Sequence, residues 1–148
     1  MPSTHVSLHC HLVFSTKCRE PMIEQNWEKD LYKYIYGIIQ NLGGVTHTIG
    51  GMPDHLHILI GMKATHCVAN LMRDIKGDSS KWIHKEIQKP AFVWQDGYGA
   101  FSVGATNLPG VTGYINDQKK HHLKQSYQTE YLDMQIRGMV EYDDRYLW

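Results

Sequence analysis

The chain has 148 residues, 42% hydrophobic and 20% charged, which predicts one globular domain spanning 1–148 and excludes an intrinsically disordered chain. Its 15 basic and 15 acidic side chains balance, which argues against a protein that holds nucleic acid by bulk positive charge but leaves room for local basic faces. The sequence has no long apolar run and no signal peptide, so we expect a cytoplasmic protein without membrane contact. Its three cysteines form no CxxC pair, and we expect them to be free thiols.

The first half of the chain predicts three strands and one helix. Residues 5–14 are rich in β-branched and aromatic side chains, as in a strand. Residues 24–41 carry apolar side chains at helical spacing, and Gly43-Gly44 ends this helix. Residues 45–50 predict a second strand, and a Pro-Asp turn leads into a third strand at 55–61.

The second half predicts one further strand between helices. Residues 66–88 have a helical pattern interrupted at 77–80, where one helix could end and another begin. Residues 92–103 predict a glycine-interrupted fourth strand, and 107–125 and 128–139 predict two more helices.

This order of elements predicts an α+β fold of the ferredoxin-like type. The pattern βαββαβ gives an antiparallel sheet in which the first and third strands are central neighbours and both helices cover one face. A C-terminal helix that carries Tyr114 is added to this plan. We expect the opposite face of the sheet to be open, as in many domains that bind single-stranded nucleic acid.

Two short motifs suggest a site that attacks a phosphodiester. His55 and His57 are two residues apart on a predicted strand, so both imidazoles point to one face and can reach one metal ion. Tyr114 and Gln118 are four residues apart on a predicted helix and project together. Two imidazoles with an amide oxygen and waters favour Mg²⁺ or Mn²⁺, and a bound cation would make the phenol an effective nucleophile.

Each piece also has a plainer interpretation. Most His-x-His pairs are ordinary half-buried histidines, and a second pair, His9 and His11, lies on the first strand. Zinc would be favoured if Cys10 or His11 supplied another ligand. Tyrosines on amphipathic helices, such as Tyr114, usually belong to the core.

Two groups of lysines are candidate contacts to DNA phosphates. A solvated helix face is the commoner explanation of such charge runs. The candidates are Lys76, Lys81 and Lys85 in one segment and Lys119 and Lys120 in another.

Several motifs, in a fixed order along nearly the whole chain, resemble the HUH nucleases. The resemblance is to their single-tyrosine branch, the small bacterial insertion-sequence transposases that move DNA as a single strand. The motifs are HLVFSTK at 11–17, MPDHLHILI at 52–60, KGDSSKWI at 76–83, WQDGYGAFS at 94–102, YINDQKKHH at 114–122 and YDDRYLW at 142–148.

The resemblance implies both a mechanism and partners. It implies that His55, His57 and Gln118 hold Mg²⁺ or Mn²⁺ against the scissile phosphate of single-stranded DNA. Tyr114 would attack that phosphate and leave a 5′-phosphotyrosine. The expected partners are DNA with hairpins at the element ends and a second copy of the chain in a homodimer, inside a prokaryotic cell. In such a homodimer, the tyrosine helix of one subunit can complete the site of the other.

Other functions stay open at this stage. One is a non-catalytic or decayed module of the same fold that binds single-stranded nucleic acid. Another is a metal-dependent phosphodiesterase that uses His55 and His57 without a covalent tyrosine.

Overall fold

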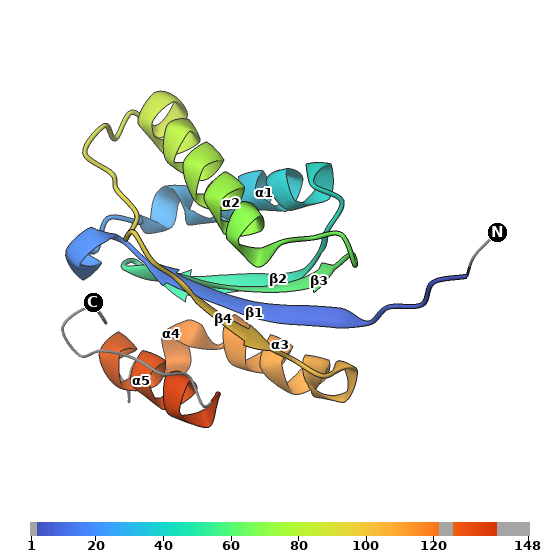
Figure 1. Ribbon diagram of the computed structural model, residues 1–148. Coiled ribbons are helices and arrows are strands. Elements are labelled where there is room, and N and C mark those ends of the chain that lie inside the picture. Colours follow the sequence, from blue (N-terminus) through green and yellow to red (C-terminus); the bar gives the residue numbers. More distant parts are fainter. Residues whose placement is uncertain (1–2, 122–125, 139–148) are drawn as a thin grey trace.

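Four antiparallel strands form a sheet in the order β2-β3-β1-β4 in the computed structural model, which describes residues 3–121 and 126–138 (Figure 1). Strands β1 and β3 lie at the centre, as the ferredoxin-like plan requires, and the predicted fold class is confirmed. The strands are β1 (Leu8–Ser15), β2 (Val45–Met52), β3 (His55–Met62) and β4 (Gly99–Ser102).

Helices lie on both faces of this sheet. One face carries α1 (Gln25–Asn41) and α2 (Val68–Trp82), and the other carries α3 (Leu108–Asn116), α4 (Gln118–His121) and α5 (Tyr127–Arg137) (Figure 1). The expectation that the second face stays open is therefore wrong, because α3 to α5 pack over the region where the histidines lie. Three short helices complete the described elements: the 3₁₀ helices η1 (Lys17–Arg19) and η3 (Ala105–Asn107), and the π-helix η2 (Ile83–Ile87).

Side chains alternate between the two faces along the central strands. The apolar residues Leu12, Phe14, Leu56 and Ile58 point toward α1 and α2 and form the main core. Each fully buried side chain of this size stabilises the fold by roughly 1.5–3 kcal/mol. The residues between them face α3 to α5, so the strand period places the histidines opposite the core.

The observed boundaries differ from the prediction around α2 and β4. Helix α2 runs through 77–80 without a break. The Ser79 hydroxyl caps no second helix: it donates to the Lys76 carbonyl at 3.2 Å and accepts from Trp94 Nε1 at 3.0 Å. Trp94 is thereby fixed against α2. In the predicted strand before β4, the described residues 92–98 make a single isolated bridge, from Trp94 to Thr16.

The predicted helix over 107–125 is divided. It consists of α3 and α4, which separate at Asp117, and Pro109 lies in the first turn of α3. The end of that prediction, together with Met139 and the motif at 142–148, lies outside the described residues. Within the part that the structure describes, no helix is long and apolar enough to cross a membrane.

Candidate metal centre and nucleophile

His55 and His57 lie at the beginning of β3, and both side chains are fully buried. Their rings lie on the same face of the sheet, as the two-residue spacing predicts, with centroids 5.2 Å apart. Each ring is tied at its Nδ1 atom. His55 Nδ1 donates to Asp54 Oδ1 at 2.7 Å, and His57 Nδ1 lies 2.8 Å from His11 Nε2. The two Nε2 atoms are left to face the helices.

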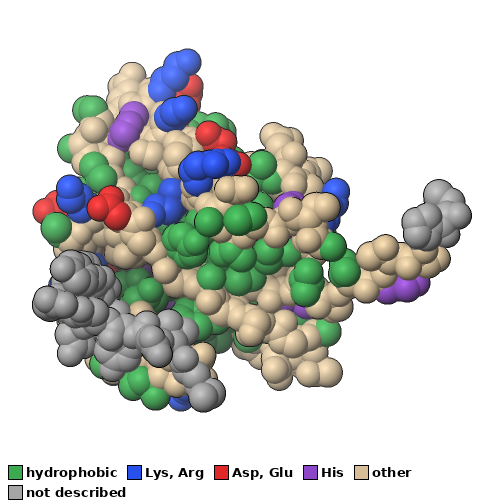
Figure 2. Space-filling model, in the orientation of Figure 1, with side chains coloured by type: hydrophobic (Ala, Val, Ile, Leu, Met, Phe, Trp, Pro, Cys, Tyr) green, Lys and Arg blue, Asp and Glu red, His purple; other side chains and the backbone are tan. Residues whose placement is uncertain are grey.

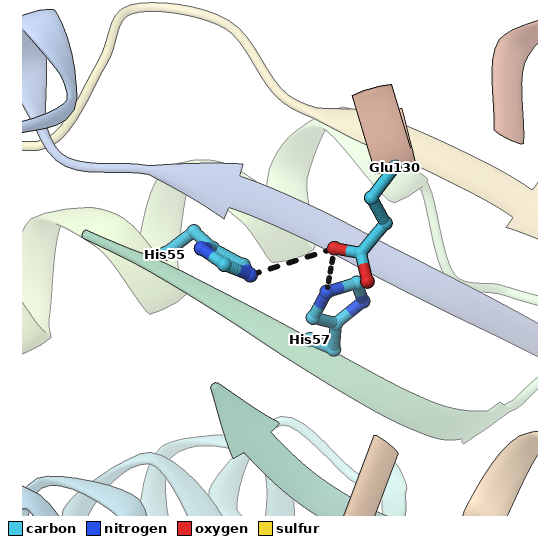
Figure 3. A group of neighbouring side chains, drawn as sticks. All are labelled: His55, His57 and Glu130. Carbon is cyan, nitrogen blue, oxygen red and sulfur yellow. Dashed lines mark hydrogen bonds and ion pairs between the residues drawn. The ribbon is translucent and has the colours of Figure 1, made fainter. Parts of the chain in front are cut away.

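A carboxylate that the sequence analysis missed lies between the two histidines. Glu130 of α5 has its Oε1 atom 2.8 Å from His57 Nε2 and 3.5 Å from His55 Nε2 (Figure 3). Its Oε2 atom accepts hydrogen bonds from the Tyr114 hydroxyl and, at 3.2 Å, from Gln118 Nε2. The Oε1 atom of Gln118 in turn lies 3.2 Å from His55 Nε2. The four residues predicted as nucleophile and metal ligands thus meet at Glu130.

Aromatic packing positions α5 over the histidines. Tyr127 and Tyr131 are buried and form a small cluster with Val13 of β1. The Tyr127 ring also stacks on His55, with centroids 4.2 Å apart. Glu130 follows Tyr127 by three positions, so it shares the buried face of the helix. A carboxylate among aromatic residues on one helical face is the sequence signal that could have identified it.

A glycine allows α3 to approach the sheet closely. A Cβ atom on Gly50 of β2 would lie 2.2 Å from the Ile115 carbonyl oxygen, so only glycine fits without displacing the helix. Ile115 itself is fully buried. The close contact of α3 with Gly50 brings Tyr114 and Gln118 over the histidines, although α3 ends at Asn116 and Gln118 begins α4.

Burial and neighbouring groups shift the pKa values of His55 and His11 in opposite directions. Burial by itself lowers the pKa of His55, but the hydrogen bonds and charges of Asp54 and Glu130 outweigh it and raise that pKa overall. Burial, helped by His57 and opposed by Glu130, lowers the pKa of His11 to about 3. His11 is therefore neutral near pH 7.

Tyr114 is half-buried at the edge of a cavity of about 560 Å³. Residues of β4, α3 and α5 line this cavity, and Arg137 lies at one side of it. Burial raises the pKa of Tyr114, and the hydrogen bond and charge of Glu130 raise it further. The phenol therefore keeps its proton and acts as a hydrogen-bond donor in this arrangement.

The donor atoms fit a divalent cation. One nitrogen each from His55 and His57 and one oxygen from Glu130 lie within 4.8 Å of one another, and all three residues are buried. Gln118 adds an amide oxygen beside His55. Such a mixture of imidazole and oxygen donors suits Mn²⁺ and Mg²⁺, and also divalent transition metals that bind nitrogen ligands more tightly.

The first lysine group lies on the opposite face of the sheet from this centre. Lys76 Nζ donates to the carbonyls of Asp96 at 3.0 Å and Gly97 at 3.1 Å, so it fastens the loop before β4 to α2. Lys81 and Lys85 are exposed at the end of α2 and in the turn that follows. Basic side chains gather over this end of the molecule in Figure 2.

The second lysine group lies on α4, near the free edge of β2. Lys119 pairs with Glu28 of α1 at 2.7 Å, and Lys120 is exposed. Both line a separate cavity of about 300 Å³. The two groups therefore do not form one continuous basic surface.

Comparison with known proteins assigns the chain to a family. The family of IS200-like transposases matches residues 4–118, a span that contains His55, His57, Tyr114 and Gln118 but ends before α5. None of the curated proteins matches the chain.

Two solved structures share its fold. A candidate transposase from Deinococcus radiodurans aligns with a TM-score of 0.64 and 21% identity, over 80% of this chain and 95% of that one. A REP-associated tyrosine transposase bound to a REP hairpin aligns with a TM-score of 0.57 and 13% identity, over 78% and 68% of the two chains. With the family match across most of its length, the chain belongs to the IS200-like transposases.

Proposed function

We propose that this protein cleaves and rejoins single-stranded DNA at hairpin-marked element ends, with Tyr114 as the nucleophile. The observation that carries the proposal is the convergence of Tyr114, Gln118, His55 and His57 on the carboxylate of Glu130. A phenol beside a set of metal-binding atoms is the arrangement that covalent phosphodiester cleavage needs. Membership of the transposase family supports DNA transposition as the outcome.

His55, His57 and Glu130 would hold a divalent cation, with Gln118 adding its amide oxygen. We propose Mg²⁺ or Mn²⁺, since two of the four donors are oxygen atoms. When bound there, such an ion polarises the scissile phosphate and stabilises the charge that develops on it. The buried protein atoms around it exclude water, which strengthens these electrostatic effects.

The chemical step exchanges one phosphoester bond for another. The Tyr114 oxygen bonds to phosphorus while the bond to the 3′ oxygen breaks, which leaves a 5′-phosphotyrosine and a free 3′-hydroxyl. Glu130 Oε2 accepts the hydrogen bond of the phenol, so it orients the hydroxyl and lies where its proton departs. The departing 3′ oxygen gains a proton, and attack by the 3′-hydroxyl of a second strand reverses the exchange without an external energy source.

Single-stranded DNA would reach Tyr114 through the cavity of about 560 Å³ beside it. Hairpins are proposed as the recognised feature; the REP-associated transposase that shares this fold was solved with a REP hairpin. The exposed Lys81, Lys85 and Lys120 remain candidate contacts to the phosphate backbone. Lys76 and Lys119 would have to exchange a contact within the protein for one to DNA.

A second copy of the chain is proposed as a further partner on the basis of the family resemblance. The tyrosine helix lies over the histidines of its own chain, so one chain can form a complete site. Mixing the Tyr114→Phe and His57→Ala variants tests helix exchange, because activity returns only when one subunit completes the site of the other. Light scattering of the wild-type protein with and without DNA measures the homodimer itself.

The function is tested with single-stranded DNA oligonucleotides that carry imperfect hairpins from the DNA flanking the gene. Each is labelled at the 5′ or the 3′ end, incubated with the protein and Mn²⁺, and run on a denaturing protein gel. We expect a protein-linked band that carries the 3′ label and is lost in Tyr114→Phe and His57→Ala. Cleavage without a linked band would indicate the phosphodiesterase, and binding without cleavage would indicate a binding module or a decayed enzyme.

A further inference from the structure

His57 is supported by a residue outside the proposed ligand set. His11 of β1 is 5% exposed, and its Nε2 atom lies 2.8 Å from His57 Nδ1. The two ring centroids are 5.0 Å apart. In the ladder between β1 and β3, Val13 pairs with His57 and His11 pairs with Leu59. The two imidazoles are thus diagonal neighbours on the face toward α3 to α5.

The two ligand histidines are supported by different chemical groups. His55 donates to Asp54, whose ionised carboxylate can only accept hydrogen bonds. The partner of His57 is a neutral imidazole, which presents a donor at one nitrogen and an acceptor at the other, according to its tautomer. A metal-binding histidine is generally oriented by a hydrogen bond at its other ring nitrogen.

An imidazole partner suits a ligand that alternates between two states. Without a cation, a neutral His57 donates from Nε2 to Glu130 Oε1, so its Nδ1 accepts from His11 Nε2. With a cation, His57 Nε2 offers a lone pair, so its Nδ1 carries the proton and donates to His11 Nε2, while the proton of His11 lies on its own Nδ1. A carboxylate in the place of His11 would serve only the second state.

We propose that His11 is a positioning residue that holds the His57 ring with Nε2 toward Glu130 and reverses its hydrogen bond when a cation binds. The proposal rests on the metal centre of the proposed function. His11 acts through His57, because its Nε2 atom faces the His57 ring and not the oxygen atoms of Glu130. It thus belongs to the support of the metal centre and not to its ligands.

The first test measures Mn²⁺ affinity from the electron paramagnetic resonance signal of free Mn²⁺ in a titration. Replacing His11 by Leu removes both hydrogen-bonding capacities, and we expect binding to weaken by about 10–100-fold. His11→Gln keeps an amide that can donate and accept, so its affinity should return close to that of the wild-type protein. Wild-type affinity in His11→Leu would overturn the proposal.

A second test reads the tautomer of His57 directly. Nuclear magnetic resonance of proteins with isotope-labelled histidine rings shows which ring nitrogen carries the proton. We expect the His57 proton to move from Nε2 to Nδ1 when Mg²⁺ is added. In His11→Leu this change should need about 10–100-fold more Mg²⁺, because the proton on Nδ1 then has no acceptor. A role for His11 in packing alone would lower stability and leave this signature unchanged, which would contradict the proposal.

Matched variants separate this proposal from the proposed function. His9 lies on the same strand and contacts His47 at 3.1 Å, away from the metal centre, so His9→Leu should bind Mn²⁺ normally. If the wild-type protein binds Mn²⁺ no better than His57→Ala, the metal centre itself is refuted. Should His11→Leu fail to fold, His11→Asn supplies the same comparison, because its shorter amide does not reach the His57 ring.

Discussion

The two faces of the central sheet use alternate residues of the same strand for different purposes. Toward α1 and α2, Leu56 and Ile58 are buried in an apolar core. Toward α3 to α5, the intervening His55 and His57 are equally buried but bound to Asp54, Gln118, Glu130 and His11. Apolar burial is non-directional, whereas a buried polar group needs each partner in place. We therefore expect one face to supply most of the stability and the other face to supply the proposed chemistry.

A substitution in the apolar core should have the largest effect, and that effect should be on stability. Ile58→Ala should lower the free energy of unfolding by roughly 2–5 kcal/mol, because it removes a fully buried side chain and leaves a cavity. The yield of DNA-linked protein per folded molecule should stay unchanged. Urea unfolding and the gel assay, normalised to the folded fraction, measure the two quantities. If the DNA-linked product per folded molecule also falls in Ile58→Ala, the two faces of the sheet do not act independently.

The contact between Gly50 of β2 and α3, the helix that carries Tyr114, gives the second test of the difference between the faces. Gly50→Ala places a Cβ atom against the Ile115 carbonyl and should cost about 1–3 kcal/mol of stability. Since α3 must move, the DNA-linked product should fall further than the folded fraction does. Gly77→Ala on α2 is the control, because a Cβ there meets nothing within 4 Å, and it should leave the product unchanged.

Glu130 tests the polar face itself. Glu130→Gln keeps the shape but removes the negative charge, and Mn²⁺ affinity should fall roughly tenfold or more, because ligand charge sets the affinity of such sites. The nearby Asp133→Asn removes a charge that pairs with Arg137 and leaves the His55 and His57 contacts intact. Calorimetric titration with Mn²⁺ compares the two, and an equal loss in both would indicate a general charge effect.

The smallest expected effect is a dependence on pH. The pKa of His55 is raised in the folded chain, so protons compete with a cation at Nε2, and Mn²⁺ affinity should fall gradually as pH drops through that pKa. The same shift stabilises the metal-free fold below the unfolded pKa of histidine. That stabilisation is lost as pH rises through the folded pKa.

Thermal unfolding at pH values on both sides of the unfolded and folded pKa of His55, with and without Mn²⁺, checks the change in Mn²⁺ affinity and the change in stability. Asp54→Asn should weaken them, since the Asp54 carboxylate is one of the groups that raise the pKa of His55. Parallel pH profiles with and without Mn²⁺ would contradict the assignment of His55 as a ligand.

Local patterns in the sequence predicted most of the fold. Apolar spacing identified α1 nearly to the residue, and the predicted strands at 45–50 and 55–61, separated by a Pro-Asp turn, match β2 and β3 closely. Predictions were poorer at 77–80 and 92–103, where long-range contacts decide the outcome. The Trp94 hydrogen bond to Ser79, for example, joins segments that no local pattern connects.

For the candidate site, the sequence determined that His55 and His57 share one face of a strand. It also paired Tyr114 with Gln118, but on a single helix, whereas the structure places them on α3 and α4. The family resemblance supplied their roles as a hypothesis. Only the tertiary structure brought the two pairs together, because the approach of α3 to Gly50 depends on packing across the sheet. It alone added Glu130, whose position depends on the docking of α5. The sequence noted His11 only as a possible further ligand, and the register of β1 on β3 places it beside His57 instead. Neither the docking nor the register is encoded in local spacing.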